Sequence, residues 1–274
     1  MSHELAGLLD ATPIWLIGVL VLGAMLLAAW AGRALAYLRG DPDEKRPDVE
    51  SHIVSAVMGL LALLVGFTFS IAMDRYDTRR VLVLEESNAI GTAYLRAQLL
   101  PEPSRDQISG VLKAYTDNRV ALSEAPRNRR APLVLENDRL VTELWRGVVA
   151  VHPRIQTLEA AGPFIESVNL VIDMDASRKV ARDAHVPALV FLLLFVYQVA
   201  SAGVLGYALS GSRSIFLAAM LFALFTLALV LTIDIDRAVG GAVRESQQPM
   251  KTLQRQLADQ PPSTYDPQPQ SDTP

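Results

Sequence analysis

The stretch from Ile53 to Leu100 constrains the fold of this chain more than any other. Its first part, 53–73, contains no charged residue and is long enough to cross a hydrocarbon core of about 30 Å as a helix. The residues from Asp74 to Arg80 are strongly charged, but no proline occurs between Pro47 and Pro101. A helix over the whole stretch would be roughly 70 Å long. We therefore predict one continuous helix, with its first half in the membrane and its second half in water.

Charged residues are nearly absent from four long apolar runs and crowd the segments between them. This uneven distribution is typical of a membrane protein with several spans. The predicted transmembrane helices are 14–32, 53–73, 186–209 and 214–233. The residues before the first run hold no Lys or Arg, whereas a cleaved signal peptide has a positive n-region, so we interpret this run as an anchor. The predicted fold class is an all-α membrane protein with four transmembrane helices.

The chain divides into four predicted segments, which are 1–73 with the first two spans, an extramembrane insert at 74–185, 186–246 with the last two spans, and 247–274. The insert shows almost no alternation of period two, so we predict that it is wholly helical. Its last helix begins at Gly162-Pro163 and is predicted to continue into the third membrane run. The segment 247–274 is rich in Pro and Gln and is predicted to be a disordered tail.

Small residues recur every four positions in the first apolar run, at Ala24, Ala28 and Gly32. Such a face allows two helices to approach closely in lipid. The alternative is that Ala and Gly are simply common in membrane helices, and the spacing alone leaves both interpretations open.

Two counts of basic residues give opposite membrane orientations. Arg39, Lys45 and Arg46 lie in the short loop after the first span, which favours a cytoplasmic location for that loop. Basic residues also follow the second span, precede the third and follow the fourth, which favours a cytoplasmic insert. We expect the insert and both termini to be cytoplasmic, partly because of the resemblance described below.

The sequence offers little for catalysis or for cofactor binding. It has no cysteine, and its four histidines have no spacing typical of a metal site. The adjacent residues Glu85 and Glu86 point about 100° apart on a helix, so they cannot converge as an acid and base pair without help from another segment. The net charge of −4 gives no basic face for nucleic acid. We predict that the protein is not an enzyme, has no cofactor and does not bind nucleic acid.

The predicted spans carry no ionisable residue near their middle, which argues against a proton-coupled carrier but not against a pore. The second span combines aromatic, hydroxyl and glycine residues in one short segment. These candidate pore-lining residues are Gly66, Phe67, Thr68, Phe69 and Ser70. Ordinary contact with lipid and with other helices is the alternative interpretation.

Beyond the membrane, the same helix carries a polar stripe with the spacing i, i+3, i+7 and i+11. Its members are Glu85, Asn88, Thr92 and Arg96. Because these positions share one helix face, we consider them a candidate vestibule wall or a contact between copies of the chain. A solvated helix surface is the alternative.

Several motifs together resemble the bestrophin-like family of bacterial membrane proteins. They are Gly59-Leu-Leu-Ala-Leu-Leu-Val-Gly-Phe-Thr-Phe-Ser70, Arg75-Tyr-Asp-Thr-Arg-Arg80, Glu85-Glu-Ser-Asn-Ala-Ile-Gly-Thr-Ala-Tyr-Leu-Arg96, Leu99-Leu-Pro-Glu-Pro103, and the later Asn169, Asp173, Arg178 and Pro187. The resemblance extends to about Arg244 and implies a distant likeness to bestrophins, which are pentameric anion channels. It implies that the second span lines the pore, that Phe67 and Phe69 lie at its neck, and that the insert and termini are cytosolic. No counterpart of the bestrophin calcium site or of the second constriction is recognisable.

Two functions follow as hypotheses. The first is an oligomeric ion channel in the bacterial inner membrane, which would be a pentamer conducting small inorganic ions, anions rather than cations, by analogy with bestrophins. The second is a non-conducting membrane module whose helical insert binds a partner or relays a signal.

Overall fold

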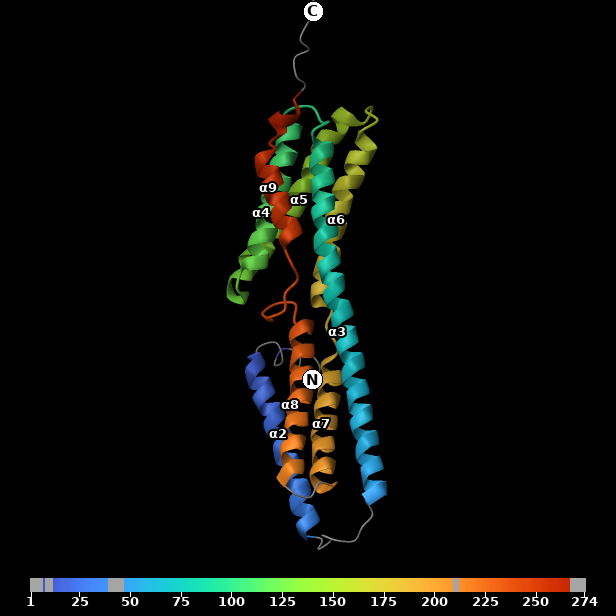
Figure 1. Ribbon diagram of the computed structural model, residues 1–274. Helices are drawn as coiled ribbons and strands as arrows, with labels where there is room; N and C mark the ends of the chain where they lie inside the picture. The colour runs from blue at the N-terminus through green and yellow to red at the C-terminus, as the bar shows by residue number, and fades with distance from the viewer. Residues whose placement is uncertain (1–6, 8–11, 39–46, 209–211, 267–274) are drawn as a thin grey trace, which may run out of the picture. The chain divides into compact units, whose positions relative to one another are not determined.

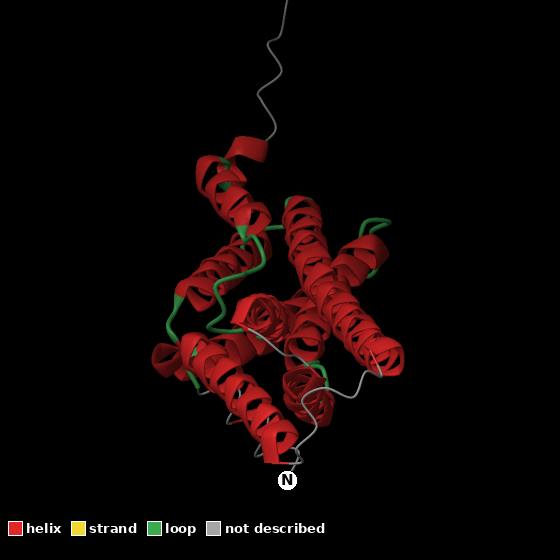
Figure 2. Ribbon diagram, turned by 60° about the horizontal axis from the view of Figure 1, so that its bottom comes forward, coloured by secondary structure: helices red, strands yellow, loops and turns green. Residues whose placement is uncertain are grey.

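The computed structural model describes residue 7 and residues 12–38, 47–208 and 212–266, and these residues contain helices and no strand (Figure 2). In chain order the long helices are α2 (Ile14–Leu38), α3 (Pro47–Ala97), α4 (Ser104–Glu124), α5 (Arg130–Ile155), α6 (Ala161–Asp183), α7 (Ala188–Ala208), α8 (Ser212–Asp236) and α9 (Gln248–Asp259) (Figure 1). Two short 3₁₀ helices, η1 (Arg127–Arg129) and η2 (Pro262–Tyr265), complete the described elements. The predicted all-α fold class is confirmed.

In the described part of the chain, four helical segments are long and apolar enough to cross a membrane. They are Ile14–Leu38, His52–Ala97, Ala161–Ala208 and Ile215–Asp236. The third segment includes both α6 and α7, but only α7 lacks charged residues, so the apolar part of this segment is α7. The four predicted spans therefore correspond to helices of the structure.

The long predicted helix is present as α3, which is helical from Pro47 to Ala97 without a break after Met73. It ends three residues earlier than predicted, because Gln98, Leu99 and Leu100 form turns before Pro101. A proline cannot continue the backbone hydrogen bonding of a helix and restricts the residue before it, so the helix must stop near this point.

The described chain divides into two compact units. Unit 1 comprises Met1–Tyr76 and Ala184–Arg244, and unit 2 comprises Asp77–Asp183 and Glu245–Pro274. Unit 1 therefore contains α2, the first part of α3, α7 and α8. Unit 2 contains the second part of α3 together with α4, α5, α6 and α9.

In unit 1, helix α2 packs closely against α7 through small residues. A Cβ atom added to Gly32 would lie 2.1 Å from the backbone oxygen of Gly203, and one added to Gly206 would lie 2.1 Å from that of Ala29. Neither position accepts any side chain at this separation of the two backbones. The smooth face of the first span is therefore a helix contact, which decides between the two interpretations of its small residues.

The core of unit 2 is formed by apolar side chains from five helices. The largest fully buried ones are Tyr115, Phe164, Ile90, Ile108, Leu112, Leu144 and Ile155. On α3 the buried positions Val83, Ile90 and Ala97 recur every seven residues, which is the spacing of one helix face. The second part of α3 thus presents one apolar face to the core of unit 2.

The structure differs from the sequence predictions between α6 and α7. Helix α6 ends at Asp183, and 184–187 are not helical, so the prediction that it continues into the third span was wrong. Pro187 disfavours a helical conformation for Val186, whose backbone N–H instead donates to the carboxylate of Asp236 at 3.0 Å.

The C-terminal segment also differs from its prediction. Over Gln248–Asp259 the predicted disordered tail is the helix α9, which buries Met250, Leu253 and Leu257. These three residues are spaced i, i+3 and i+7, and Pro249 stands in the first turn, where a helix tolerates proline. The high content of Pro and Gln concealed this pattern. Residues 267–274 of the predicted tail lie outside the described residues.

Candidate functional site

The five candidate pore-lining residues of α3 do not share one face of the helix. Phe67 is 61% exposed in the single chain, and Ser70 is also exposed. Thr68 is buried, and its hydroxyl donates to the backbone oxygen of Leu64 at 2.9 Å. The structure therefore brings Phe67 and Ser70 to the outer face of unit 1 and turns Thr68 inward.

Gly66 and Phe69 lie on a third side of α3, where they line a groove against α8. The groove has a volume of about 400 Å³, and its other lining residues include Leu221, Phe225 and Ala228. Residues two apart on a helix point about 200° away from each other. Phe67 and Phe69 consequently face different surroundings.

The polar stripe lies in unit 2. Glu85, Asn88 and Thr92 are exposed, whereas Arg96 is half-buried and donates to the backbone oxygen of Pro163 at 2.6 Å. Arg96 therefore attaches α3 to the start of α6, and only the other three residues form an outward polar surface.

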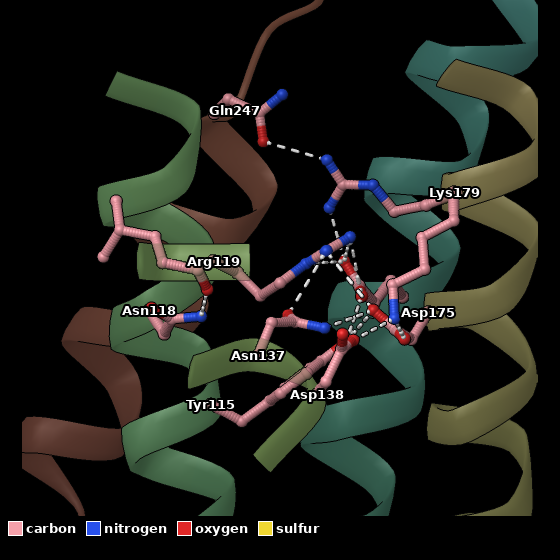
Figure 3. Close-up of polar contacts among 11 residues, drawn as sticks. Tyr115, Asn118, Arg119, Asn137, Asp138, Asp175, Lys179 and Gln247 are labelled. Atoms are coloured by element: carbon pink, nitrogen blue, oxygen red, sulfur yellow. Dashed lines mark hydrogen bonds and ion pairs between the residues drawn. The ribbon is translucent and has the colours of Figure 1, made fainter. Parts of the chain in front are cut away.

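Glu86, which follows Glu85 directly, is fully buried at the centre of a charged network (Figure 3). The hydroxyl of Tyr115 on α4 donates to Glu86 Oε1 at 2.6 Å. Arg119, one turn further along α4, donates through Nε and Nη2 to Glu86 Oε2 at 3.2 and 3.1 Å. Arg178 of α6 donates to the same carboxylate oxygen. One carboxylate thus meets two guanidinium groups and a phenol.

A second buried carboxylate, Asp175 of α6, extends this network to α5. It accepts hydrogen bonds from Asn137 Nδ2 at 2.8 Å and from Arg119 Nη1 at 3.4 Å. Lys179 Nζ lies 2.6 Å from Asp175 Oδ2 and 2.6 Å from Asp138 Oδ1. Figure 3 shows these side chains converging from α4, α5 and α6. The network therefore joins α3, α4, α5 and α6, with positive and negative charges in close balance.

The C-terminal segment reaches the same network. Arg178 donates through Nη2 to Gln247 Oε1 at 3.5 Å, and Gln247 is the residue directly before α9 (Figure 3). Further along, the Tyr94 hydroxyl donates to the backbone oxygen of Gln260 at 2.8 Å. The segment after Arg244 is thus an integral part of unit 2.

Burial controls the protonation of the phenol in this network. Burial raises the pKa of Tyr115 well above its usual range, while the guanidinium of Arg119 opposes this shift and the carboxylate of Glu86 adds to it. Tyr115 is therefore a neutral hydrogen-bond donor at physiological pH. A buried carboxylate is stable only while such donors and opposite charges surround it.

Sequence reasoning missed the role of Glu86, although its position carried a signal. Glu86 lies between Val83 and Ile90 in the register of the buried face of α3. Arg119 similarly continues the apolar series Ile108, Leu112 and Tyr115 on α4. A charged residue in the register of an apolar stripe indicates a buried ion pair, because a lone buried charge would be very costly.

The network ties α3, α4, α5 and α6 of unit 2 together. Its buried charged groups are paired with one another, and within the described ranges no cluster of three or more His, Asp or Glu side chains could hold a metal ion. Of the sequence-predicted candidates, Phe67, Ser70, Glu85, Asn88 and Thr92 are exposed on α3.

Comparison with known proteins agrees with this arrangement of helices. A crystal structure of a point variant of a bacterial bestrophin homologue from Klebsiella pneumoniae superposes with a TM-score of 0.70 and 16% identity, covering 90% of this chain and 98% of that chain. Another variant of the same homologue superposes with a TM-score of 0.67 and 15% identity, covering 88% of this chain and 97% of that chain. A third structure of the homologue, solved by Zn-SAD phasing, has a TM-score of 0.66 and 16% identity, covering 90% of this chain and 98% of that chain. No curated protein matches the chain by sequence.

The family model for the bestrophin-like domain matches residues 13–265, which is nearly the whole described chain. The apolar helices identified above and this match together define a membrane protein. The chain belongs to the bestrophin-like family.

Proposed function

We propose that several copies of this chain assemble into a ring that conducts small inorganic ions across the bacterial inner membrane. The first part of α3 from each copy would face the axis of the ring. Membership of the bestrophin-like family supports this proposal, and the family likeness to bestrophin channels favours a pentamer and favours anions.

The observation that carries the proposal is the outward face of α3 in unit 1. Exposed residues on this face include Leu60, Leu63, Phe67 and Ser70, which recur at intervals of three or four, and Ile71, which follows Phe67 by four. A surface of this kind, with aliphatic, aromatic and hydroxyl groups, matches the apolar constrictions that gate some pores by excluding water.

The outward face of α3 in unit 2 has a different composition. The polar residues Glu85, Asn88 and Thr92 are exposed there together with the apolar residues Val81, Leu84 and Leu95. Exposed apolar groups beside polar ones are typical of contacts between protein surfaces. In the proposed ring this face forms a wall of a vestibule and part of the contact between neighbouring copies.

We also propose that the insert and both termini lie in the cytoplasm. Arg75, Arg79 and Arg80 after the second span support this orientation. Accessibility of single cysteines introduced at Glu85 and at Gln256 tests it, since the chain has no other cysteine.

Phe67 provides the direct test of the channel. The purified protein is reconstituted into planar bilayers after its number of copies has been measured in native-like lipid. We expect a conductance that Phe67→Ala changes at least severalfold. Phe216→Ala is the matched control, because Phe216 is also largely exposed but lies on α8, and we expect this variant to conduct like the parent.

The alternative function, a non-conducting module that binds a partner through unit 2, predicts different results. A confirmed ring without any conductance, or a stable monomer in lipid, would contradict the channel. Equal effects of Phe67→Ala and Phe216→Ala on the conductance would contradict the proposal that α3 lines the conduction pathway.

A further inference from the structure

Helix α7 places two polar side chains inside the apolar core of unit 1. Gln198, at the midpoint of α7, is 0% exposed, and Ser201 is 1% exposed. The two positions are three apart, so their side chains lie on the same face of the helix. The surrounding core contains residues such as Met25, Leu194 and Phe222. Polar groups in such a place require hydrogen-bond partners.

Gln198 has a partner for only one end of its amide. Nε2 donates to the backbone oxygen of Phe225 on α8 at 3.4 Å. Because a carbonyl oxygen can only accept, this contact requires the nitrogen of the amide to face Phe225. The other end, Oε1, is buried, and no donor among the described residues reaches it.

Ser201 differs from the other buried hydroxyls of the described membrane helices, each of which has a partner. The Thr226 hydroxyl donates to Met25 Sδ at 3.7 Å. The hydroxyls of Thr68 and Thr232 donate to the backbone oxygen four residues earlier, at 2.9 and 2.7 Å. The Ser201 Oγ atom makes no such bond and is buried without a partner in the described part of the chain. Its hydroxyl is therefore available to a group outside its own helix.

We propose that one water molecule is bound between Gln198 Oε1 and Ser201 Oγ. The Ser201 hydroxyl donates to the water oxygen, and the water donates one hydrogen to Gln198 Oε1. Buried waters typically make about three hydrogen bonds, and a helix carbonyl accepts the second hydrogen. One molecule thus satisfies both orphan oxygens, whose burial would otherwise be costly.

The chemistry of the site favours water over an ion. Gln198 and Ser201 are both neutral, and a cation such as calcium takes six to eight oxygen ligands, including carboxylates. The bound water fixes the orientation of the Gln198 amide, whose nitrogen donates to the backbone oxygen of Phe225 on α8. The inference concerns the packing of unit 1 and does not depend on ion conduction.

A double-mutant cycle on the full-length protein tests the shared water. The variants are Gln198→Met, Ser201→Ala and the combination, and the folding equilibrium constant is measured in lipid bicelles. We expect each single substitution to lower this constant roughly threefold to tenfold, because one hydrogen-bonded network is lost. The double variant should lower the folding equilibrium constant no more than the more harmful single substitution does, because each substitution already releases the same bound water.

Thr232→Val is the matched control. Thr232 is also buried in unit 1, but its hydroxyl is satisfied within α8, so its effect should add independently to that of Ser201→Ala. Single substitutions that stabilise the protein, or that combine additively, would show that the site is dry and would overturn the proposal.

A density map of the parent protein gives a second readout in case the variants do not fold. At a resolution where other buried waters are visible, we expect a peak within hydrogen-bond distance of both Gln198 Oε1 and Ser201 Oγ. An empty position in such a map would overturn the proposal independently of any variant.

Discussion

Glu85 and Glu86 are neighbours in the sequence with opposite surroundings in the structure. Glu85 is exposed, whereas Glu86 is fully buried against Arg119 and Arg178. Glu86 shares the inward face of α3 with the buried apolar residues Val83 and Ile90. Glu85, one residue earlier, therefore points outward with the polar stripe.

Replacing Glu86 should be far more damaging than replacing Glu85. Glu86→Gln leaves two buried guanidinium groups without their shared counter-charge, and breaking such a pair costs about 3–5 kcal/mol. Glu85→Gln is the matched control and should change stability by less than about 0.5 kcal/mol, as exposed sites do. Chemical unfolding of the two variants measures the difference, and equal effects would contradict the buried network.

Tyr115 makes the stability of unit 2 sensitive to alkaline pH. Its pKa in the folded protein is raised above 10.0 by burial, so below that pH the phenol is protonated in both states. At higher pH the unfolded chain loses this proton first, and stability falls by about 1.4 kcal/mol per pH unit until the folded pKa is reached. Unfolding followed from pH 9 upward tests this loss.

Tyr115→Phe separates this effect from the titration of other groups. The variant should be less stable at neutral pH, because Glu86 loses a hydrogen bond of 2.6 Å, but it should lose less stability as the pH rises. Parallel pH profiles for parent and variant would show that Tyr115 does not titrate in this way.

At the scale of the elements, close backbone contact joins α2 to α7. Gly206→Ala would place a methyl group 2.1 Å from the backbone oxygen of Ala29, so the helices must separate. Overpacking of this kind costs about 1–3 kcal/mol or more. We expect a lower melting temperature for this variant in detergent.

Gly23→Ala is the control on the same pair of helices. Apart from neighbouring backbone of its own helix, no heavy atom of the described chain lies within 4 Å of a Cβ built at Gly23, and Ala has the higher helix propensity. This variant should be neutral or slightly more stable. Similar losses for both glycines would mean that α2 and α7 are not in close contact.

Helix α3 shows how far local sequence signals reach. The absence of proline between Pro47 and Pro101 correctly predicted an unbroken helix past Met73. The same local signals could not tell that Phe67 and Phe69 face different surroundings. That distinction depends on α8, which comes from a distant part of the chain and forms the groove beside Phe69.

At the scale of the whole molecule, the end of the chain returns to complete unit 2. Met250, Leu253 and Leu257 of α9 are buried in the same core as residues of α3, α4 and α5. The insert predicted at 74–185 is therefore not a complete folding unit, because its core includes side chains that follow the fourth span.

Removing the apolar side of α9 should destabilise unit 2. Met250→Ala with Leu253→Ala empties two buried positions, each worth about 2–5 kcal/mol. The matched double variant, Arg255→Ala with Gln256→Ala, changes only exposed residues of the same helix and should remain close to the parent. Limited proteolysis compares the two, and equal resistance would contradict the docking of α9.

The sequence alone determined the helical fold class, the four spans and the continuity of α3. These properties depend on the hydropathy of a single segment and on whether it contains helix-breaking residues such as proline. Both are local features of the sequence. Only the tertiary structure decided which charges are buried, which face of α3 is outward and whether the C-terminal segment folds. Those outcomes depend on partners far along the chain, such as Arg119 and Arg178 for Glu86, because burial of a polar group is favourable only where its partners converge.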